Sequence, residues 1–592
     1  MELTTIDWLI VAAFFALSLG IGLGVSRKSG QDFSSFFLAG RNMPWWLLGI
    51  SIVATTFSTD TPNLVADITR SNGVVGNWVW WAFLLTGMVT VFLYAKLWRR
   101  SGVMTDVEFY ELRYSGPLAA FLRGFRAAYL GILFNVVIMA SVTLAAIKIG
   151  SVMMGWAPLQ TVVVAASVTM LYSVAGGLRG VVLTDMIQFT LAIAGSIAAA
   201  IYVVNLPEVG GLSALLDHPN VRDKAAFLPD FSTMTWQDLI PIFVIPLAVQ
   251  WWATYYPGSE PGGGGYVVQR MLATRSERDA ATATFAFNVM HYALRPWPWI
   301  LVALASLVVF PDLASIGDRF PHVPDSKLGH DLAYPAMLTF LPPGLLGLVF
   351  TGLAAAYMST ISTQVNWGAS VVVNDIYQRF YKPDASQREL VLVGRMFTAL
   401  LLVLACVLAL AMENALQAFN IILQIGAGTG LLYILRWFWW RVNAAAELTA
   451  MVVSFVIAIL FATRGGLGLE SWEQLVVGVG VTTVAWVSVA LLGRPTDSAT
   501  LFSFLNRVRP GGPGWKKIRE TAAREGVALG DADGDFPAAL LATVLGCIAI
   551  YAAMFATGFL IYGQAGAGLG MIAVALIAGL ALWSQVRKLS FR

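Results

Sequence analysis

Long apolar runs separated by short polar segments make up most of this chain. A hydrocarbon core about 30 Å thick takes about 20 apolar residues of helix to cross. By that criterion the sequence predicts an all-α integral membrane protein with about fifteen membrane-spanning helices. The predicted segments lie near 6–26, 45–70, 75–98, 120–151, 157–177, 181–204, 236–257, 281–310, 343–374, 390–412, 415–439, 446–463, 473–493, 538–563 and 566–587.

Lysine and arginine residues are spread unevenly over the connecting loops. If the N-terminus lies outside, the loops and helix ends assigned to the cytoplasm contain most of the 37 basic residues. Cytoplasmic loops of membrane proteins carry such an excess. The first apolar run follows Glu2 and Asp7 and precedes Arg27-Lys28, which is the reverse of a signal peptide. We therefore expect a retained first helix, a cytoplasmic C-terminus and a place in the plasma (cell inner) membrane.

The composition narrows the functional classes. Apolar residues make up 58% of the chain and charged residues 12%, against about 25% charged in typical soluble proteins, so we expect the lipid bilayer as the surrounding medium. The net charge of +3 does not point to a nucleic-acid partner. Cys406 and Cys547 both lie in apolar segments, which argues against a disulfide framework or a thiolate metal site. We find no nucleophile–base pair, metal cluster or nucleotide motif, so an enzyme is not expected.

Two polar stretches interrupt apolar segments. Residues 354–366 contain Ser359, Thr360, Ser362 and Thr363, and residues 54–62 contain six polar residues and a proline. Hydroxyl oxygens and carbonyls freed by unwinding are suitable ligands for a dehydrated hard cation. Irregular backbone at membrane depth is tolerated only where it lines a cavity or is buried in protein. The alternative is that serine and threonine bond to their own backbone or join helices.

Several ordered motifs resemble one known family, the sodium/solute symporters, which includes sodium-coupled proline, galactose and sialic acid carriers. The resemblance runs from about residue 7 to about residue 493. The motifs are Phe37-Leu-Ala-Gly-Arg41 with Trp45-Trp46, Gly176-Gly177 with Thr184-Asp185 and Gln188, Gln269-Arg270, and Ala355-Ala356-Tyr-Met-Ser359-Thr360 with Asn366 and Asp375-Ile-Tyr377.

The resemblance implies a LeuT-type core, a five-plus-five inverted repeat with extra helices at both ends. Such folds bind solute and ion near the membrane midplane, beside broken helices. The core would cover residues 45–439, with repeats at about 45–204 and 236–439. The remaining regions would be an N-terminal helix and loop at 1–44, two peripheral helices at 440–493, a cytoplasmic linker at 494–537 and two extra helices at 538–592.

The resemblance also implies a first sodium site. By the family pattern its ligands would be the carbonyls of Ala54, Phe57 and Ala356 and the hydroxyls of Ser359 and Thr360. All of these groups are neutral, so sodium would bring its own charge.

A second sodium ion is a further possibility. Some family members join an acid to helix hydroxyls, and here Asp185, Ser359, Ser362 and Thr363 match that set. Acids in membrane helices are costly and usually functional. The alternative is that Asp185 pairs with an arginine such as Arg179.

The sequence identifies the solute site less well. The candidate lining residues are Thr55, Thr56, Asp60, Asn77, Trp252, Tyr255, His291, Arg295 and Gln424. Gln424 matches a sugar-contacting glutamine of galactose carriers, Asp60 favours an amine, and Arg295 favours a carboxylate. These indications conflict, and Arg295 could instead pair with Asp60, Glu260 or helix-end carbonyls.

Sodium-coupled symport of a small polar organic solute by alternating access is the function that these features favour. A proton-coupled carrier, with Asp185 taking the proton, is one alternative. A solute sensor built on a transporter domain is another. The glycine run 260–265 is expected to form an inner gate or tight turn, residues 494–537 a solvated linker, and the last two helices a contact with the bundle edge or with another copy.

Overall fold

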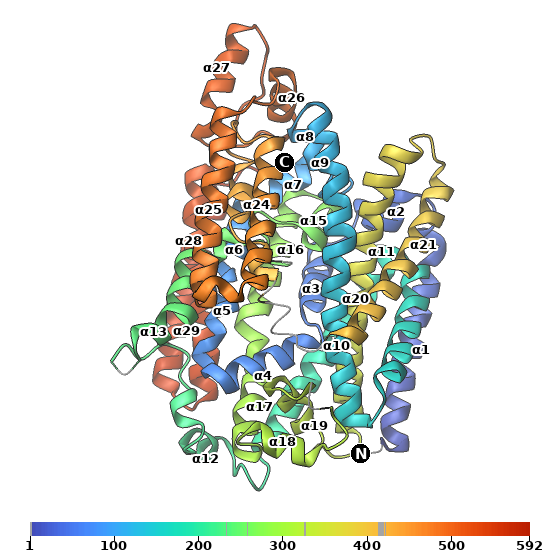
Figure 1. Ribbon diagram of the computed structural model, residues 1–592, viewed down its shortest axis with the longest axis vertical. Helices are drawn as coiled ribbons and strands as arrows, with labels where there is room; N and C mark the ends of the chain where they lie inside the picture. The colour runs from blue at the N-terminus through green and yellow to red at the C-terminus, as the bar shows by residue number, and fades with distance from the viewer. Residues whose placement is uncertain are drawn as a thin grey trace.

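Figure 1 shows the computed structural model of the protein, in which the ordered elements are helices. It describes residues 3–232, 234–256, 258–324, 327–412, 420 and 422–591. Within them eleven helical stretches are long and apolar enough to cross a membrane. The expected all-helical class is confirmed, whereas the count of fifteen crossings stays a prediction. The start of the predicted segment 415–439 lies outside the described residues.

The first part of the chain forms bundled helices joined by short turns. Their bounds are α1 (Thr5–Ser29), α2 (Phe33–Leu38), α3 (Trp45–Thr56), α4 (Asp60–Asn72), α5 (Trp78–Trp81), α6 (Phe83–Val89), α7 (Ala95–Ser101), α8 (Phe109–Arg113), α9 (Gly116–Ala128), α10 (Asn135–Met154), α11 (Pro158–Val204) and α12 (Leu212–Asp217). A π-helical turn at 90–94 joins α6 to α7, and another at 129–134 joins α9 to α10.

The second part repeats this pattern of long helices joined by short ones. The bounds are α13 (Trp236–Leu239), α14 (Trp251–Ala253), α15 (Gly265–Ala273), α16 (Glu277–Val289), α17 (Pro296–Val309), α18 (Leu313–Arg319), α19 (Ala333–Leu338), α20 (Leu345–Val371), α21 (Gln387–Ala411), α23 (Gly430–Leu435), α24 (Ala444–Thr463), α25 (Ser471–Leu492), α26 (Ser498–Val508), α27 (Lys516–Arg524), α28 (Phe536–Ile561) and α29 (Ala565–Val586). A π-helical turn at 290–294 joins α16 to α17.

The longest helix, α11, bends at a glycine. Its 47 residues would measure about 70 Å if straight, which exceeds the thickness of a bilayer. Gly177 has φ 55°, and a Cβ there would lie 2.7 Å from the carbonyl oxygen of Phe36. Glycine is therefore needed both for the backbone conformation and for the close approach of α2. The bend falls between the two segments that hydropathy predicts at 157–177 and 181–204.

The polar stretch at 54–62 forms the expected break. Helix α3 ends at Thr56, Phe57 leaves helical geometry with φ −89° and ψ 77°, and α4 begins at Asp60. Pro62 falls in the first turn of α4, where a proline costs no backbone hydrogen bond. The break therefore leaves backbone groups free for other partners in the middle of the helix bundle.

Helix α20 lies at the centre of the packing. Every side chain from Ala355 to Val371 on this helix is buried. It packs along α11 and also touches α3, α10 and α21. The hydroxyl groups predicted to face a site are thus enclosed by other helices and turned away from lipid.

The segment at 494–537 is folded onto the core, so the expectation of a solvated linker is wrong. Asp533 and Asp535 are buried, and Lys96 at the start of α7 binds both carboxylates, at 3.0 and 2.7 Å. Arg100 joins Asp533 to Glu277 at the start of α16, at 3.0 and 2.8 Å. The sequence alone does not show that Lys96 and Arg100 of α7 lie next to these aspartates in the fold.

The last two helices pack against the edge of the bundle. Helix α28 contacts α6 and the π-helical turn before α17, and α29 packs on α28. The Tyr551 hydroxyl donates a hydrogen bond to the carbonyl of Trp81 at 2.9 Å. These helices therefore contact the bundle edge, which is one of the two roles expected, and contact with another copy stays a prediction.

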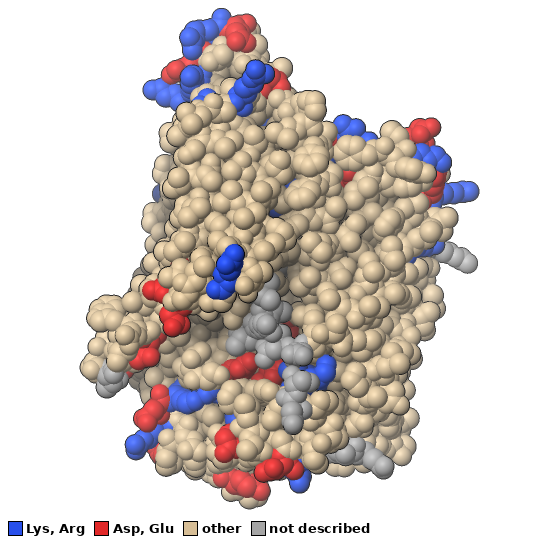
Figure 2. All heavy atoms as spheres, viewed as in Figure 1, with Lys and Arg blue, Asp and Glu red and all other residues tan. Residues whose placement is uncertain are grey.

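Charged side chains are confined to limited parts of the surface. On the face shown in Figure 2 they gather at the upper end, over α26 and α27, and in the lower third, with an almost uncharged band between. In Figure 1 the two ends of the chain lie towards opposite ends of the molecule. Both features suit a protein whose middle is surrounded by lipid.

Candidate ion and solute site

The hydroxyl groups of α20 meet the broken end of α3. Thr360 Oγ1 donates a hydrogen bond to the carbonyl of Thr55 at 2.7 Å. The Oγ1 atoms of Thr55 and Thr363 lie 3.0 Å apart. Two polar stretches about 300 residues apart in the sequence therefore share one buried cluster of oxygen atoms.

The groups assigned to the first sodium site are all contributed by this junction. Ala54 and Phe57 lie at the end of α3, where the Phe57 amide donates to the Ala54 carbonyl at 3.1 Å and to the Val53 carbonyl at 2.9 Å. Ala356 is 2% exposed on α20, one turn before Thr360. Each residue offers an oxygen atom and none carries a formal charge, which fits a monovalent hard cation.

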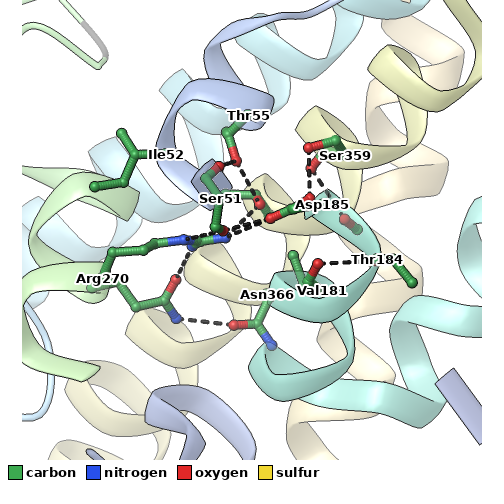
Figure 3. Close-up of polar contacts among 12 residues, drawn as sticks. Ser51, Ile52, Thr55, Val181, Thr184, Asp185, Arg270, Ser359 and Asn366 are labelled. Atoms are coloured by element: carbon green, nitrogen blue, oxygen red, sulfur yellow. Dashed lines mark hydrogen bonds and ion pairs between the residues drawn. The ribbon is translucent and has the colours of Figure 1, made fainter. Parts of the chain in front are cut away.

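Ser359 hydrogen-bonds to a carboxylate. Its Oγ donates to Asp185 Oδ1 at 2.7 Å, while Ser51 Oγ donates to Asp185 Oδ2 at 2.5 Å. Asp185 comes from α11 and is fully buried. Figure 3 shows its carboxylate between Ser51 of α3 and Ser359 of α20.

A buried guanidinium lies beside the same carboxylate. Arg270 of α15 is fully buried, and its Nη2 lies 3.9 Å from Asp185 Oδ2. The same nitrogen donates to Thr363 Oγ1 at 2.6 Å. Figure 3 shows the guanidinium directed towards Ser51 and Asp185.

This arrangement separates the members of the second predicted sodium set. Ser359 contacts Asp185, but Thr363 contacts Arg270, and Ser362 Oγ donates to the carbonyl of Ser359 at 3.1 Å. The partner of Asp185 is therefore an arginine, although not Arg179, which donates to the carbonyl of Ala39.

A cavity of about 130 Å³ opens beside the break in α3. Five of the nine predicted solute-binding residues line it: Thr55, Thr56, Asp60, His291 and Arg295. Thr360 lines it as well. The cavity and the ion-binding candidates thus share residues of α3 and α20.

The other four predicted residues do not line this cavity and have partners elsewhere. Asn77 donates to Thr69 Oγ1 at 3.1 Å and accepts from the Trp80 indole at 2.9 Å. Trp252 donates to the carbonyl of Ala248. The Tyr255 hydroxyl lies 3.4 Å from Glu260 Oε1, and Gln424 donates to Gln474 Oε1 at 3.1 Å.

Several lining residues were not predicted. They are mainly aromatic or hydroxyl-bearing: Ser58, Trp80, Phe83, Tyr256, Ser259, Tyr266 and Tyr292. Tyr256 lines the cavity although its neighbour Tyr255 does not. The chain is extended at Thr254, just after α14, so successive side chains point in different directions, which helical spacing cannot anticipate.

Asp60 and Arg295 bring opposite charges to the cavity. Arg295 is 2% exposed, and it donates to Thr56 Oγ1 at 2.9 Å and lies 3.2 Å from His291 Nε2. Asp60 accepts a hydrogen bond from the hydroxyl of Ser58. Within the described residues neither group forms a direct ion pair, so the pairing of Asp60 with Arg295 that the sequence suggested is absent here.

Known proteins resemble this chain over most of its length. It is 27% identical over 472 residues to a protein named sodium/glucose cotransporter from Vibrio parahaemolyticus, covering 77% of this chain and 85% of that one. It is 28% identical over 491 residues to the sodium/myo-inositol cotransporter of Bos taurus, covering 77% and 67%.

A solved structure shares the fold. The substrate-bound, outward-open state of a Na⁺-coupled sialic acid symporter aligns with a TM-score of 0.66 and 21% identity, covering 84% of this chain and all of that one. The family model of the sodium:solute symporter family matches residues 36–454. That match spans the broken helix, Asp185, Arg270, the hydroxyl groups of α20 and the cavity, and the chain belongs to the sodium:solute symporter family.

Proposed function

We propose that this protein is a sodium-coupled symporter that moves a small polar organic solute into the cell by alternating access. The observation that carries the proposal is the contact between Thr55 and Thr360. Both residues line the cavity. Thr55 follows the proposed sodium ligand Ala54, and Thr360 is itself a proposed ligand. An ion bound there would hold the broken end of α3 against α20 and so would shape the solute cavity.

The proposed sodium site consists of the carbonyls of Ala54, Phe57 and Ala356 with the hydroxyls of Ser359 and Thr360. In the structure these hydroxyls donate to Asp185 and to the Thr55 carbonyl, and they would turn their lone pairs to the ion when it binds. Sodium would supply the driving force, because one charge crossing 100 mV releases about 2.3 kcal/mol.

We propose one sodium ion for each transport cycle. The guanidinium of Arg270 contacts Thr363 and lies near Asp185, which are both members of the second predicted set. A sodium ion that bound to these residues would have to displace the guanidinium of Arg270. Ser362 would have to turn away from the carbonyl of Ser359 as well.

The wider architecture follows as part of the proposal. The inverted repeats would occupy 45–204 and 236–439, with the N-terminus outside and α26 and α27 in the cytoplasm. The positions of the chain ends in Figure 1 support an odd number of crossings. The basic residues around 494–524 support the cytoplasmic assignment of that loop.

Uptake into liposomes tests the proposal. Purified protein should accumulate a labelled solute when an inward sodium gradient is imposed, and should not when choline replaces sodium at constant pH. Accumulation that follows a proton gradient in choline would instead support proton coupling.

The double variant Ser359→Ala with Thr360→Ala tests the site. It should lower sodium-driven uptake at least about tenfold, because charge-assisted contacts to a desolvated ion are worth about 1.5–3 kcal/mol. The matched control is Thr351→Ala with Ser370→Ala, since these hydroxyls lie on the same helix and bond only to nearby backbone carbonyls. Equal uptake by the two double variants would sink the site assignment.

A further inference from the structure

The cavity contains a buried arginine without a carboxylate partner. Arg295 is 2% exposed, and within the described residues its polar contacts are Thr56 Oγ1, the Val53 carbonyl and His291. Its Nε has no hydrogen-bond partner. A charged group inside a membrane protein is costly unless it is paired or serves a pathway. Arg295 lines the cavity, so an anionic group bound there would give the guanidinium the negative partner that the chain does not supply.

The same cavity contains an acid without a basic partner. Asp60 is the first residue of α4, and the Ser58 hydroxyl donates to its carboxylate. The N-terminus of a helix favours negative charge. The Asp60 carboxylate in the cavity lining can therefore pair with a positively charged group of a solute.

Aromatic rings form much of the remaining wall. The rings of Phe83 and Tyr256 are stacked with centroids 5.3 Å apart, and Trp80 meets His291 edge to face at 5.7 Å. Such rings favour an apolar solute body, and their faces attract an ammonium group. The cavity thus has two charged positions of opposite sign and a largely apolar surround.

A sugar would match only part of this cavity. The hydroxyl-bearing residues and the Gln364 amide suit a polyol, but the predicted amides Asn77 and Gln424 do not line the cavity. Gln424 is bonded to Gln474, and Asn77 is bonded to Thr69 and Trp80, so these amides are engaged outside the cavity. A neutral solute would also leave the charges of Asp60 and Arg295 without partners.

We propose that the transported solute is a small zwitterion, whose anionic group binds Arg295 and whose ammonium group binds Asp60. This inference rests on the proposed function, since it takes the cavity to be the solute site. It departs from the sugars and polyols named for the relatives above, and it reconciles the opposing indications of Asp60 and Arg295.

The experiment begins with thermal shifts of the purified full-length protein in sodium. The panel contains the twenty standard amino acids, two amino sulfonic acids, two carboxybetaines, glucose and myo-inositol. We expect at least one zwitterion to stabilise the protein and the two neutral polyols to have no effect. For the amino acid that stabilises the protein most, affinity is then compared with that of its carboxamide, which lacks the anion, and of its N-acetyl form, which lacks the cation. Each should bind about 10- to 100-fold more weakly.

Variants connect each charge to one residue. The Arg295→Gln variant should bind the zwitterion only as weakly as the unchanged protein binds the carboxamide. The affinity for the carboxamide should be almost the same in the variant and in the unchanged protein. The Asp60→Asn variant should bind the zwitterion only as weakly as the unchanged protein binds the N-acetyl form, and its affinity for the N-acetyl form should be almost unchanged. Asp67→Asn is the matched control, because Asp67 lies on the same helix, hydrogen-bonds to Ser71 and does not line the cavity.

The outcomes separate this inference from the proposed function. Three results would overturn the proposal that the solute is a zwitterion. They are stabilisation by glucose or myo-inositol, binding of the carboxamide or N-acetyl form as tight as that of the zwitterion, and no stabilisation by any zwitterion in the panel. Stabilisation of the solute-free protein by sodium over choline is measured in parallel. Its absence would count against sodium coupling, whichever solute binds.

Discussion

Two buried arginines differ in what surrounds them. Arg270 donates to Ser51, Gln269 and Thr363 and has a carboxylate 3.9 Å away. Arg295 has hydroxyl, carbonyl and imidazole contacts, no carboxylate among the described residues, and a nitrogen without a partner. Both are almost completely buried, so exposure alone would place them in the same class.

The difference lies in whether the protein completes the contacts of the guanidinium. Arg270 is saturated by protein groups from α3, α15 and α20, so its charge serves to join helices. Arg295 is left incomplete at the wall of a cavity, so its charge is available to a solute. The role of a buried arginine therefore depends on whether protein groups form a hydrogen bond with each of its nitrogen atoms.

Removing Arg270 should give the larger loss of stability. Arg270→Gln leaves the Asp185 carboxylate buried with only the hydroxyls of Ser51 and Ser359. Breaking a buried pair in this way costs about 3–5 kcal/mol. Chemical unfolding in detergent, without sodium or solute so that binding does not contribute, measures the loss.

The double variant Asp185→Asn with Arg270→Gln is the control for this prediction. It removes both charges and should recover a large part of the lost stability. If the double variant is as unstable as Arg270→Gln alone, the pair is not the reason for the loss.

Removing Arg295 should change stability far less. Arg295→Gln loses contacts to Thr56 and His291 but also removes a buried charge that no carboxylate compensates. These effects oppose each other, so we expect a change within about 1 kcal/mol in the same unfolding experiment. A loss as large as that of Arg270→Gln would remove the distinction between the two arginines.

Gln424→Ala should have the smallest effect. Its amide bonds to Gln474 outside the cavity, and an exposed or half-buried hydrogen bond is worth about 0.5–1.5 kcal/mol. Solute affinity should change less than about twofold, because neither Gln424 nor Gln474 lines the cavity. A tenfold change would correspond to about 1.4 kcal/mol. A large loss of affinity would bring Gln424 back into the solute site.

Much of the fold could be predicted from the sequence. Apolar length predicted the long helices, and the polar stretch at 54–62 predicted the break between α3 and α4. The sequence also placed Thr55, Asp60 and Arg295 in one predicted solute site, and all three line the cavity. These inferences succeed because they depend on local chemistry or on motifs within a single helix.

The remaining features depend on how distant segments pack. Arg270 follows Asp185 by 85 residues, and only the folded bundle places the two side chains together. The same holds for Lys96 and Asp535, which the sequence assigned to a helix end and a solvated linker. Tyr256 was missed in favour of Tyr255 because the backbone leaves helical geometry just before them.

The clamp formed by Lys96, Arg100, Asp533 and Asp535 gives the last two helices a mechanical role. It ties α7 and the start of α16 to the start of α28, and α28 also packs on α6. A label on the exposed outer face of α29 would therefore travel with α6 and α16 and would not serve as a fixed reference. A label on the hairpin of α28 and α29 would thus report the displacement of buried helices without altering the cavity.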